Sequence, residues 1–242
     1  MKLVIIRHGD PDYEHDSLTE VGFREAELLS ERVRRMDVTA FYQSPLGRAQ
    51  ATARPSLEKM NRTAETLDWL REFPIVIKGK DGSHDGCCWD WIPEVWTNEP
   101  RFFNKDEWYN VDVFKNAGVK EKYEEVCRGL DALLEKHGYK RENNYYRAVR
   151  PNEDTIVLFC HFGLECVLLS HLMNVSPMVL WHGTCAAPTS VTTTVTEERR
   201  EGIAYFRMGS FGDTSHLYVA GEEPSFAARF CEKYTNFEQR HD

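Results

Sequence analysis

Short apolar runs rich in strand-forming residues recur along the chain, and polar residues follow three of them. These three runs cover residues 3–6, 41–43 and 155–160. A short, continuous apolar run is typical of a strand that is buried on both faces of a parallel sheet. Near the end of the chain, residues 190–196 and 203–207 predict two further strands joined by a turn at 199–202, which together form an antiparallel hairpin.

Apolar residues repeat at helical intervals between these strands. The predicted helices cover residues 19–35, 45–60 and 123–137. Thr19 is expected to cap the first helix and Ser44, which precedes a proline, to cap the second, while Pro55 is expected to kink or interrupt the second. Residues 63–67 predict a short strand, and the polar stretch 139–154 predicts a loop. Strands that alternate with helices predict an α/β fold.

Residues 74–118 differ from the rest of the chain, because glycines, a Cys87–Cys88 pair and many aromatic side chains gather there. The aromatic residues are Trp89, Trp91, Trp96, Phe102, Phe103, Trp108, Tyr109 and Phe114. We expect an inserted lid over the site, whose aromatic side chains form either its own small core or a clamp for a substrate. The predicted organisation is one domain over residues 1–242 with 74–118 as the insertion.

Histidines and arginines stand where ligands bind in a sheet of this kind. Arg7 and His8 directly follow the first strand, and His161 directly follows the strand at 155–160. Ligands of open α/β sheets bind outside the carboxyl ends of the strands. Arg48 falls in the first turn of the second helix, near its positive end. These groups predict a site for a phosphoryl group, because arginines grip its oxygens bidentately and the helix dipole adds to them.

The chain resembles the histidine phosphatase superfamily, the phosphoglycerate mutase-like proteins. The matching segments are Arg7-His8-Gly9, residues 18–26, residues 44–49 with Thr52 and Ala53, Leu70-Arg71-Glu72, His161 with Gly163, and residues 212–217. They follow the order of the family from residue 1 to about 220. Asp10-Pro11 and Phe162 depart from the common pattern, but neither removes a group that does chemistry. The resemblance implies a three-layer α/β/α sandwich with a mostly parallel central sheet and an inserted lid.

The resemblance also implies a covalent intermediate on His8. A neutral imidazole is a nucleophile at physiological pH, since its unperturbed pKa is about 6.5. We expect His8 to attack phosphorus and form a phosphohistidine. Arg7, Arg48 and His161 would stabilise the charge that spreads over the oxygens of the transferring group.

A leaving alkoxide needs a proton, so a carboxylic acid must stand near His8. The resemblance nominates Glu72 for this role, whereas Asp81 and Asp85 in the glycine-rich loop are rival carboxylates by sequence alone. His216 is expected to support the pocket, with direct contact to the phosphate as the alternative.

Composition restricts the partners. The 242 residues include 30 basic and 39 acidic side chains, and the net charge of −9 disfavours nonspecific binding to nucleic acid or to an anionic membrane. No apolar run approaches the roughly 20 residues of a membrane span, and the start of the chain lacks the apolar core of a signal peptide. The 7 cysteines fit free thiols in the cytoplasm. His84 with Cys87 and Cys88 lacks the paired spacing of a zinc site, so we expect neither metal nor cofactor.

The leading hypothesis is a phosphatase that hydrolyses a small phosphorylated metabolite; a homodimer is left open. A phosphoglycerate mutase-type transfer is the second hypothesis, and it requires another anion pocket, for which Arg101 and Lys105 are candidates. A phospho-ligand-binding regulatory module without turnover is the third. The sequence does not specify the organic half of the substrate.

Overall fold

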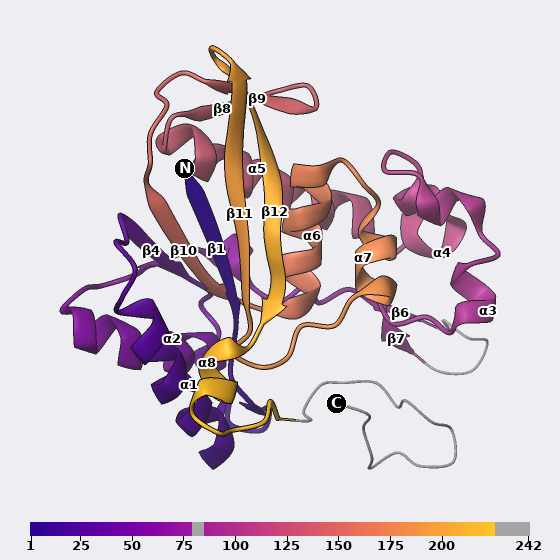
Figure 1. Cartoon of the computed structure of the whole chain (residues 1–242). Helices are drawn as coiled ribbons and strands as arrows, with labels where there is room; N and C mark the ends of the chain where they lie inside the picture. Colours follow the sequence, from indigo (N-terminus) through magenta and orange to yellow (C-terminus); the bar gives the residue numbers. More distant parts are fainter. Residues whose placement is uncertain (79–84, 226–242) are drawn as a thin grey trace.

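An eight-stranded sheet forms the centre of the computed structural model, which describes residues 1–78 and 85–225 (Figure 1). The strands of this sheet lie in the order β5-β4-β10-β1-β11-β12-β9-β8. The strands are β1 (Lys2–Arg7), β4 (Ala40–Gln43), β5 (Glu65–Thr66), β8 (Tyr139–Glu142), β9 (Tyr145–Ala148), β10 (Thr155–Cys160), β11 (Val191–Arg200) and β12 (Ile203–Asp213). Within this sheet only β11 and β9 run against β1, which confirms a mostly parallel sheet.

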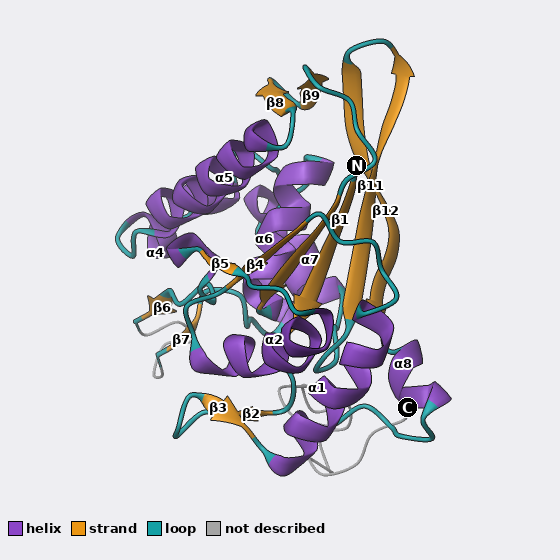
Figure 2. Cartoon of the chain, turned by 90° about the vertical axis from the view of Figure 1, so that its left-hand side faces the viewer, coloured by secondary structure: helices purple, strands orange, loops and turns teal. Residues whose placement is uncertain are grey.

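Helices pack on both faces of the sheet (Figure 2). Alternate side chains of β1 belong to the two buried clusters on opposite faces. The main helices are α1 (Glu20–Val33), α2 (Gly47–Met60), α5 (Val119–Lys136), α6 (Phe162–Met173), α7 (Pro177–Gly183) and α8 (Ser215–Val219). Val4 and Ile6 belong to a buried cluster with residues of α1 and α2. Leu3 and Ile5 point to the other face and belong to the cluster that α5 and α6 complete. Successive strand residues face opposite sides, so this pattern gives three layers.

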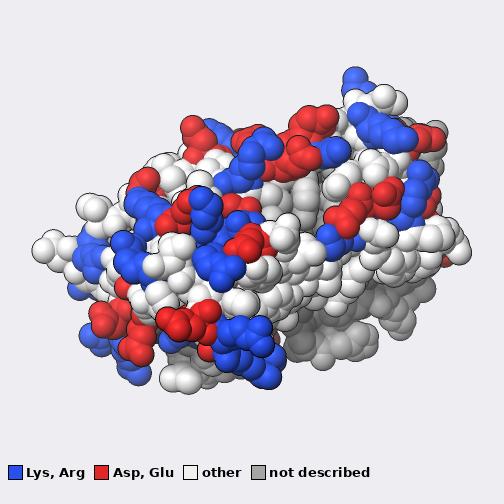
Figure 3. Space-filling model, turned by 90° about the horizontal axis from the view of Figure 1, so that it is seen from above, with Lys and Arg blue, Asp and Glu red and all other residues white. Residues whose placement is uncertain are grey.

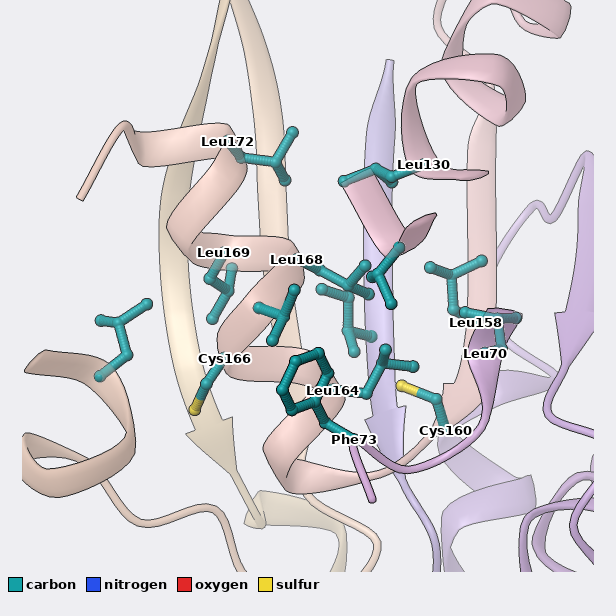
Figure 4. Close-up of a cluster of buried hydrophobic side chains, with 14 of the residues drawn as sticks. Leu70, Phe73, Leu130, Leu158, Cys160, Leu164, Cys166, Leu168, Leu169 and Leu172 are labelled. Atoms are coloured by element: carbon teal, nitrogen blue, oxygen red, sulfur yellow. The ribbon is translucent and has the colours of Figure 1, made fainter. Parts of the chain in front are cut away.

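The face covered by α5 and α6 holds the larger core (Figure 4). Leu164, Leu168 and Leu172 of α6 meet Leu158 of β10 within this cluster. Helix α6 is apolar on nearly every side, which is typical of a helix that is buried all round. Its N-terminal turn lies at the edge of the sheet where β1 and β10 end, so the core fixes the position of this turn.

The aromatic insertion packs onto the main body of the protein. It contains β6 (Val76–Ile77), β7 (Gly86–Cys87), α3 (Pro93–Trp96), η2 (Pro100–Phe103), η3 (Trp108–Asn110) and α4 (Asp112–Lys115). Trp108 is fully buried, with its ring centroid 5.5 Å from that of Trp181 in α7 and 5.1 Å from that of Tyr123 in α5. Phe102 and Phe114 are buried in the same cluster. These side chains therefore serve as core and not as a clamp for a substrate.

The structure corrects several sequence-based expectations. The predicted loop over residues 139–154 contains the hairpin β8–β9, because Asn143 adopts the left-handed turn conformation and Tyr146 buries its ring against Phe206. Ser44 does not cap α2, which begins at Gly47 and continues through Pro55 without a break. Thr19 does cap α1 as expected, accepting a hydrogen bond from the amide of Gly22.

Phe23 lies in the predicted helix over residues 19–35, and in the structure it is 42% exposed on α1. Ala26, Leu29 and Val33, which share its helical spacing, are buried, so the buried apolar stripe of α1 is narrower than the sequence spacing indicates. The tail hairpin of β11 and β12 is confirmed and is longer than the sequence predicts.

Candidate functional site

The ends of β1 and β10 bring the two predicted histidines together. Arg7 is the partner of Cys160 in the last register position of the two strands, and the amide of His8 donates to the carbonyl of Cys160 at 3.0 Å. The imidazole centroids of His8 and His161 are 5.1 Å apart. Parallel pairing in register therefore places both histidines at one edge of the sheet.

The hydrogen bond of His8 determines which nitrogen is free. Nδ1 lies 2.7 Å from the carbonyl oxygen of Gly9, and since a carbonyl only accepts, Nδ1 carries the proton. The Nε2 lone pair is then available for attack. Burial, followed by the charge of Arg7, holds the pKa of His8 well below its usual range, so the ring is neutral near pH 7.

His161 is held by Ser44, a residue that the sequence places in the family-matching segment 44–49 and predicts as a helix cap. Nε2 of His161 lies 2.8 Å from Oγ of Ser44, and that oxygen also accepts from the amide of Leu46 at 3.2 Å. Nδ1 of His161 is buried and has no hydrogen-bond partner. Burial, followed by the nearby His8, holds the pKa of His161 well below its usual range. An imidazole nitrogen is thus left for a ligand.

Arg7 and Arg48 lie close to the two histidines. Arg7 is 3% exposed and donates through Nη1 to the carbonyl of Ala186, while its Nε has no partner. Arg48 lies in the first turn of α2, as expected, and its Nε is also buried without a partner. A carboxylate already occupies part of this helix end: Asp16 accepts from Nη1 of Arg48 at 2.7 Å and from the amide of Gly47 at 2.7 Å.

Glu72 lies against the N-terminus of α6. Its carboxylate accepts from the amides of Phe73 at 2.8 Å, Leu164 at 2.9 Å and Gly163 at 3.3 Å. Burial raises the pKa of Glu72, although these amides and the charge of Arg7 oppose the rise. A Cβ at Gly163 would lie 2.7 Å from Oε1 of Glu72 and 3.0 Å from Nε1 of Trp89. Only glycine admits this close approach.

The remaining candidates are not equivalent to Glu72. Asp85 is exposed at the start of β7, and Asp81 and His84 lie outside the described residues. His216 does not join the two histidines directly: its Nε2 lies 3.1 Å from Oγ1 of Thr189, whose amide donates to the carbonyl of His8 at 3.1 Å. His216 is therefore connected to His8 only through Thr189, and burial lowers the pKa of His216 to about 4.

Sequence reasoning missed residues that hold the site in shape. Asp16 and Ser44 position Arg48 and His161, and both act across long sequence separations that no local pattern reveals. Glu165 is a third omission. It is 1% exposed, and it is the only acidic residue in the otherwise apolar helix α6, which was a signal available in the sequence.

On the face seen in Figure 3, basic and acidic side chains are interspersed. Within residues 1–78 and 85–225 there is no group of three or more His, Cys, Asp and Glu side chains arranged to hold a metal ion. No helix in the same ranges has the length and apolarity to cross a bilayer.

Comparison with known proteins identifies the same family as the motifs. The family model of the histidine phosphatase superfamily (branch 1) matches residues 3–207. A probable phosphoglycerate mutase, GpmB, of Yersinia pestis is 35% identical over 86 residues, which are 32% of this chain and 40% of that protein. The GpmB of Yersinia pseudotuberculosis matches to the same extent. The chain therefore matches about two fifths of the length of these relatives.

Solved structures share the fold. A phosphoserine phosphatase variant of Entamoeba histolytica, in complex with phosphoserine, superposes with a TM-score of 0.61 at 17% identity and covers 89% of this chain and 98% of its own. A mycobacterial glucosyl-3-phosphoglycerate phosphatase with bound vanadate gives a TM-score of 0.56 at 18% identity, covering 87% of this chain and 98% of its own. At this identity the likeness establishes the three-layer fold.

Proposed function

Because the chain belongs to the histidine phosphatase superfamily, we propose that it hydrolyses a small organic phosphomonoester through a phosphohistidine on His8. One observation carries the proposal. Three buried nitrogens beside His8 have no hydrogen-bond partner: Nε of Arg7, Nε of Arg48 and Nδ1 of His161. Buried polar groups are nearly always paired, so unpaired nitrogens on three side chains close to His8 indicate the place of an anion.

The first chemical step uses the free lone pair of His8. Nε2 attacks phosphorus, the bond from phosphorus to the ester oxygen breaks, and Glu72 gives its proton to the departing oxygen. The raised pKa of Glu72 suits a group that must be protonated before it acts. Arg7 and Arg48 face the oxygens that gain charge, and His161 adds a donor if Ser44 gives its hydroxyl proton to Nε2.

The second step returns the enzyme to its starting state. Glu72, now a carboxylate, takes a proton from water as the water oxygen attacks phosphorus, and the bond between phosphorus and Nε2 breaks. The products are an alcohol and inorganic phosphate, and Glu72 is again protonated. The three amides that bind the Glu72 carboxylate hold it in place through both steps.

A mutase is the second candidate, because the Yersinia relatives are probable phosphoglycerate mutases. A mutase must hold a second phosphate, and Arg101 and Lys105 were the candidate cations. Arg101 donates twice to Glu99, and Lys105 contacts both oxygens of Asp106 at 2.7 and 2.8 Å. Each of the two cations is therefore already paired with a carboxylate, and for this reason we favour hydrolysis over a mutase reaction.

Phosphoenzyme trapping tests the mechanism. A turnover reaction on a panel of phosphomonoesters is quenched in alkali, which preserves phosphohistidine, and the modified residue is mapped by mass spectrometry. We expect phosphate on His8 and none in a His8→Asn variant. A label on serine or aspartate, or full activity of the variant, would exclude this intermediate.

The same panel separates hydrolase from mutase. With 3-phosphoglycerate as substrate, a hydrolase releases phosphate, whereas a mutase forms 2-phosphoglycerate in a reaction that depends on 2,3-bisphosphoglycerate. We expect phosphate release for at least one member of the panel. Rapid interconversion of the phosphoglycerates with little free phosphate would assign the chain to the mutases.

A further inference from the structure

Glu165 is a buried carboxylate that the proposed reaction does not use. It lies in the first turn of α6, one residue after Leu164, whose amide binds Glu72. Its side chain is 1% exposed, and neither of its oxygens has a hydrogen-bond partner at normal length. A buried charge without partners is costly, so a residue of this kind at a ligand site needs an explanation.

The groups around Glu165 connect it to the anion site. Arg7 of β1 attracts its negative charge and Glu72 repels it. The hydroxyl of Thr192 in β11 favours the ionised form, and the thiols of Cys160 and Cys166 border the carboxylate. The favourable charge in this set belongs to Arg7, which is also one of the two arginines that face the ligand.

We propose that Glu165 takes up a proton from solvent when a dianionic phosphoryl group binds at Arg7 and Arg48, so that binding of the anion is coupled to protonation of this carboxyl. The proposal rests on the proposed function, because it requires the anion to bind at these arginines. Glu165 acts through Arg7 and does not touch the substrate.

The coupling follows from the charge balance of the site. In the free protein Arg7 offsets the negative charge of Glu165. When a dianion also binds the guanidinium of Arg7, Glu165 remains buried, and a second negative charge now lies near it without screening by solvent. Protonation removes the conflict. Burial already raises the pKa of Glu165 to about 7, so only a further rise is needed for uptake near neutral pH.

Linkage makes the effect reciprocal. If the anion favours the protonated carboxyl, then protonation of the carboxyl strengthens anion binding by the same factor. Affinity should therefore fall as pH rises through the titration of Glu165. In kinetics the effect appears in KM, because Glu165 is not one of the groups that transfer a proton to substrate.

Calorimetric titration with tungstate measures this proton directly. Tungstate is used because it is a tetrahedral dianion with no proton of its own to exchange near pH 8. The heat of binding is compared in HEPES and in Tris, which differ in ionisation enthalpy, and the difference gives the protons taken up per anion. Glu165→Gln is compared with the wild type, and Glu72→Gln is the matched control at the carboxylate that binds the N-terminus of α6.

We expect the wild type to take up about half to one proton more per anion than Glu165→Gln. His8, His161 and Glu72 also lie at the site, and any uptake by them remains in the variant, so only the difference reports on Glu165. Equal uptake in the two proteins would overturn the coupling. Failure of the wild type to bind tungstate would instead overturn the anion site, and the proposed function with it.

An infrared measurement keeps the test independent of how Glu165→Gln folds. In Glu72→Gln, tungstate binding near pH 8 should produce the C=O stretching band of a newly protonated carboxyl, because Glu165 is still present. Absence of that band while tungstate is bound would contradict proton uptake by Glu165.

Discussion

Replacement of Glu165 by glutamine should change the pH dependence of folding by an amount that the structure sets. In an unfolded chain the pKa of a glutamic acid is about 4.5, whereas burial raises that of Glu165 to about 7. Between these values the folded chain binds more protons than the unfolded chain, so this residue lowers stability as pH rises. Each pKa unit corresponds to about 1.4 kcal/mol, and the gap gives about 3 kcal/mol.

Other groups titrate in the same range with the opposite sign. His8 and His161 are buried as neutral rings with lowered pKa values, so their unfolded forms bind more protons and they favour folding at higher pH. The wild-type profile is therefore a sum, and the difference between wild type and Glu165→Gln isolates the carboxyl. That difference should shift by about 3 kcal/mol in favour of the variant as pH rises from about 4.5 to about 7.

Urea unfolding of both proteins at several pH values in this range measures the difference. The exposed Glu201, in the turn between β11 and β12, provides a control variant, Glu201→Gln, with the same substitution at a side chain that is not buried. A constant cost of burying the new amide moves all Glu165→Gln values equally and does not alter the slope. A slope equal to that of the control would refute the assignment of a raised pKa to Glu165.

Three predictions concern the proposed chemistry. Glu72→Gln should lower the steady-state rate of hydrolysis of esters with poor leaving groups by about 10² to 10⁴ and leave that of aryl phosphates unchanged. If Asp85→Asn shows this selective loss and Glu72→Gln does not, the acid is Asp85 and not Glu72. Gly163→Ala should show the same selective loss because its Cβ displaces Glu72, whereas Gly209→Ala, with its nearest contact at 3.8 Å, should keep both activities. Arg48→Ala should lower kcat/KM by about 10² to 10³. An equal loss in a variant of a surface arginine would contradict a contact between Arg48 and the phosphoryl group.

The sequence predicts the site well where local pattern and parallel pairing act together. A continuous apolar run places Arg7 and His8 at one strand end, and a similar run places His161 at another. Because the two strands pair in parallel and in register, these residues lie together at one edge of the sheet. Arg48 follows in the same way from the strand before its helix, although the helix starts later than expected.

The parts that the sequence did not predict depend on contacts between distant segments. Asp16 reaches Arg48 across 32 residues, and Ser44 reaches His161 across 117. Polar residues such as these look like caps or turns when only their neighbours in sequence are considered. The hairpin at 139–148 was missed for a related reason, since its polar composition hides the tyrosine ring of Tyr146 that anchors it in the core.

An acidic protein binds an anion only where cations are concentrated at one site and where the anion can displace the carboxylates that are paired with these cations. Arg48 is paired with Asp16, and Arg7 is flanked by Glu72 and Glu165, so an incoming phosphoryl group competes with carboxylates for both guanidiniums. Two of these three carboxyls have raised pKa values and can be neutralised by protons. In the reaction that we propose, protonation does two things at this site: it prepares Glu72 to act as the acid, and it removes a competing charge at Glu165. In the same proposal, the third carboxylate, Asp16, orients Arg48 through the hydrogen bond from Nη1 at 2.7 Å.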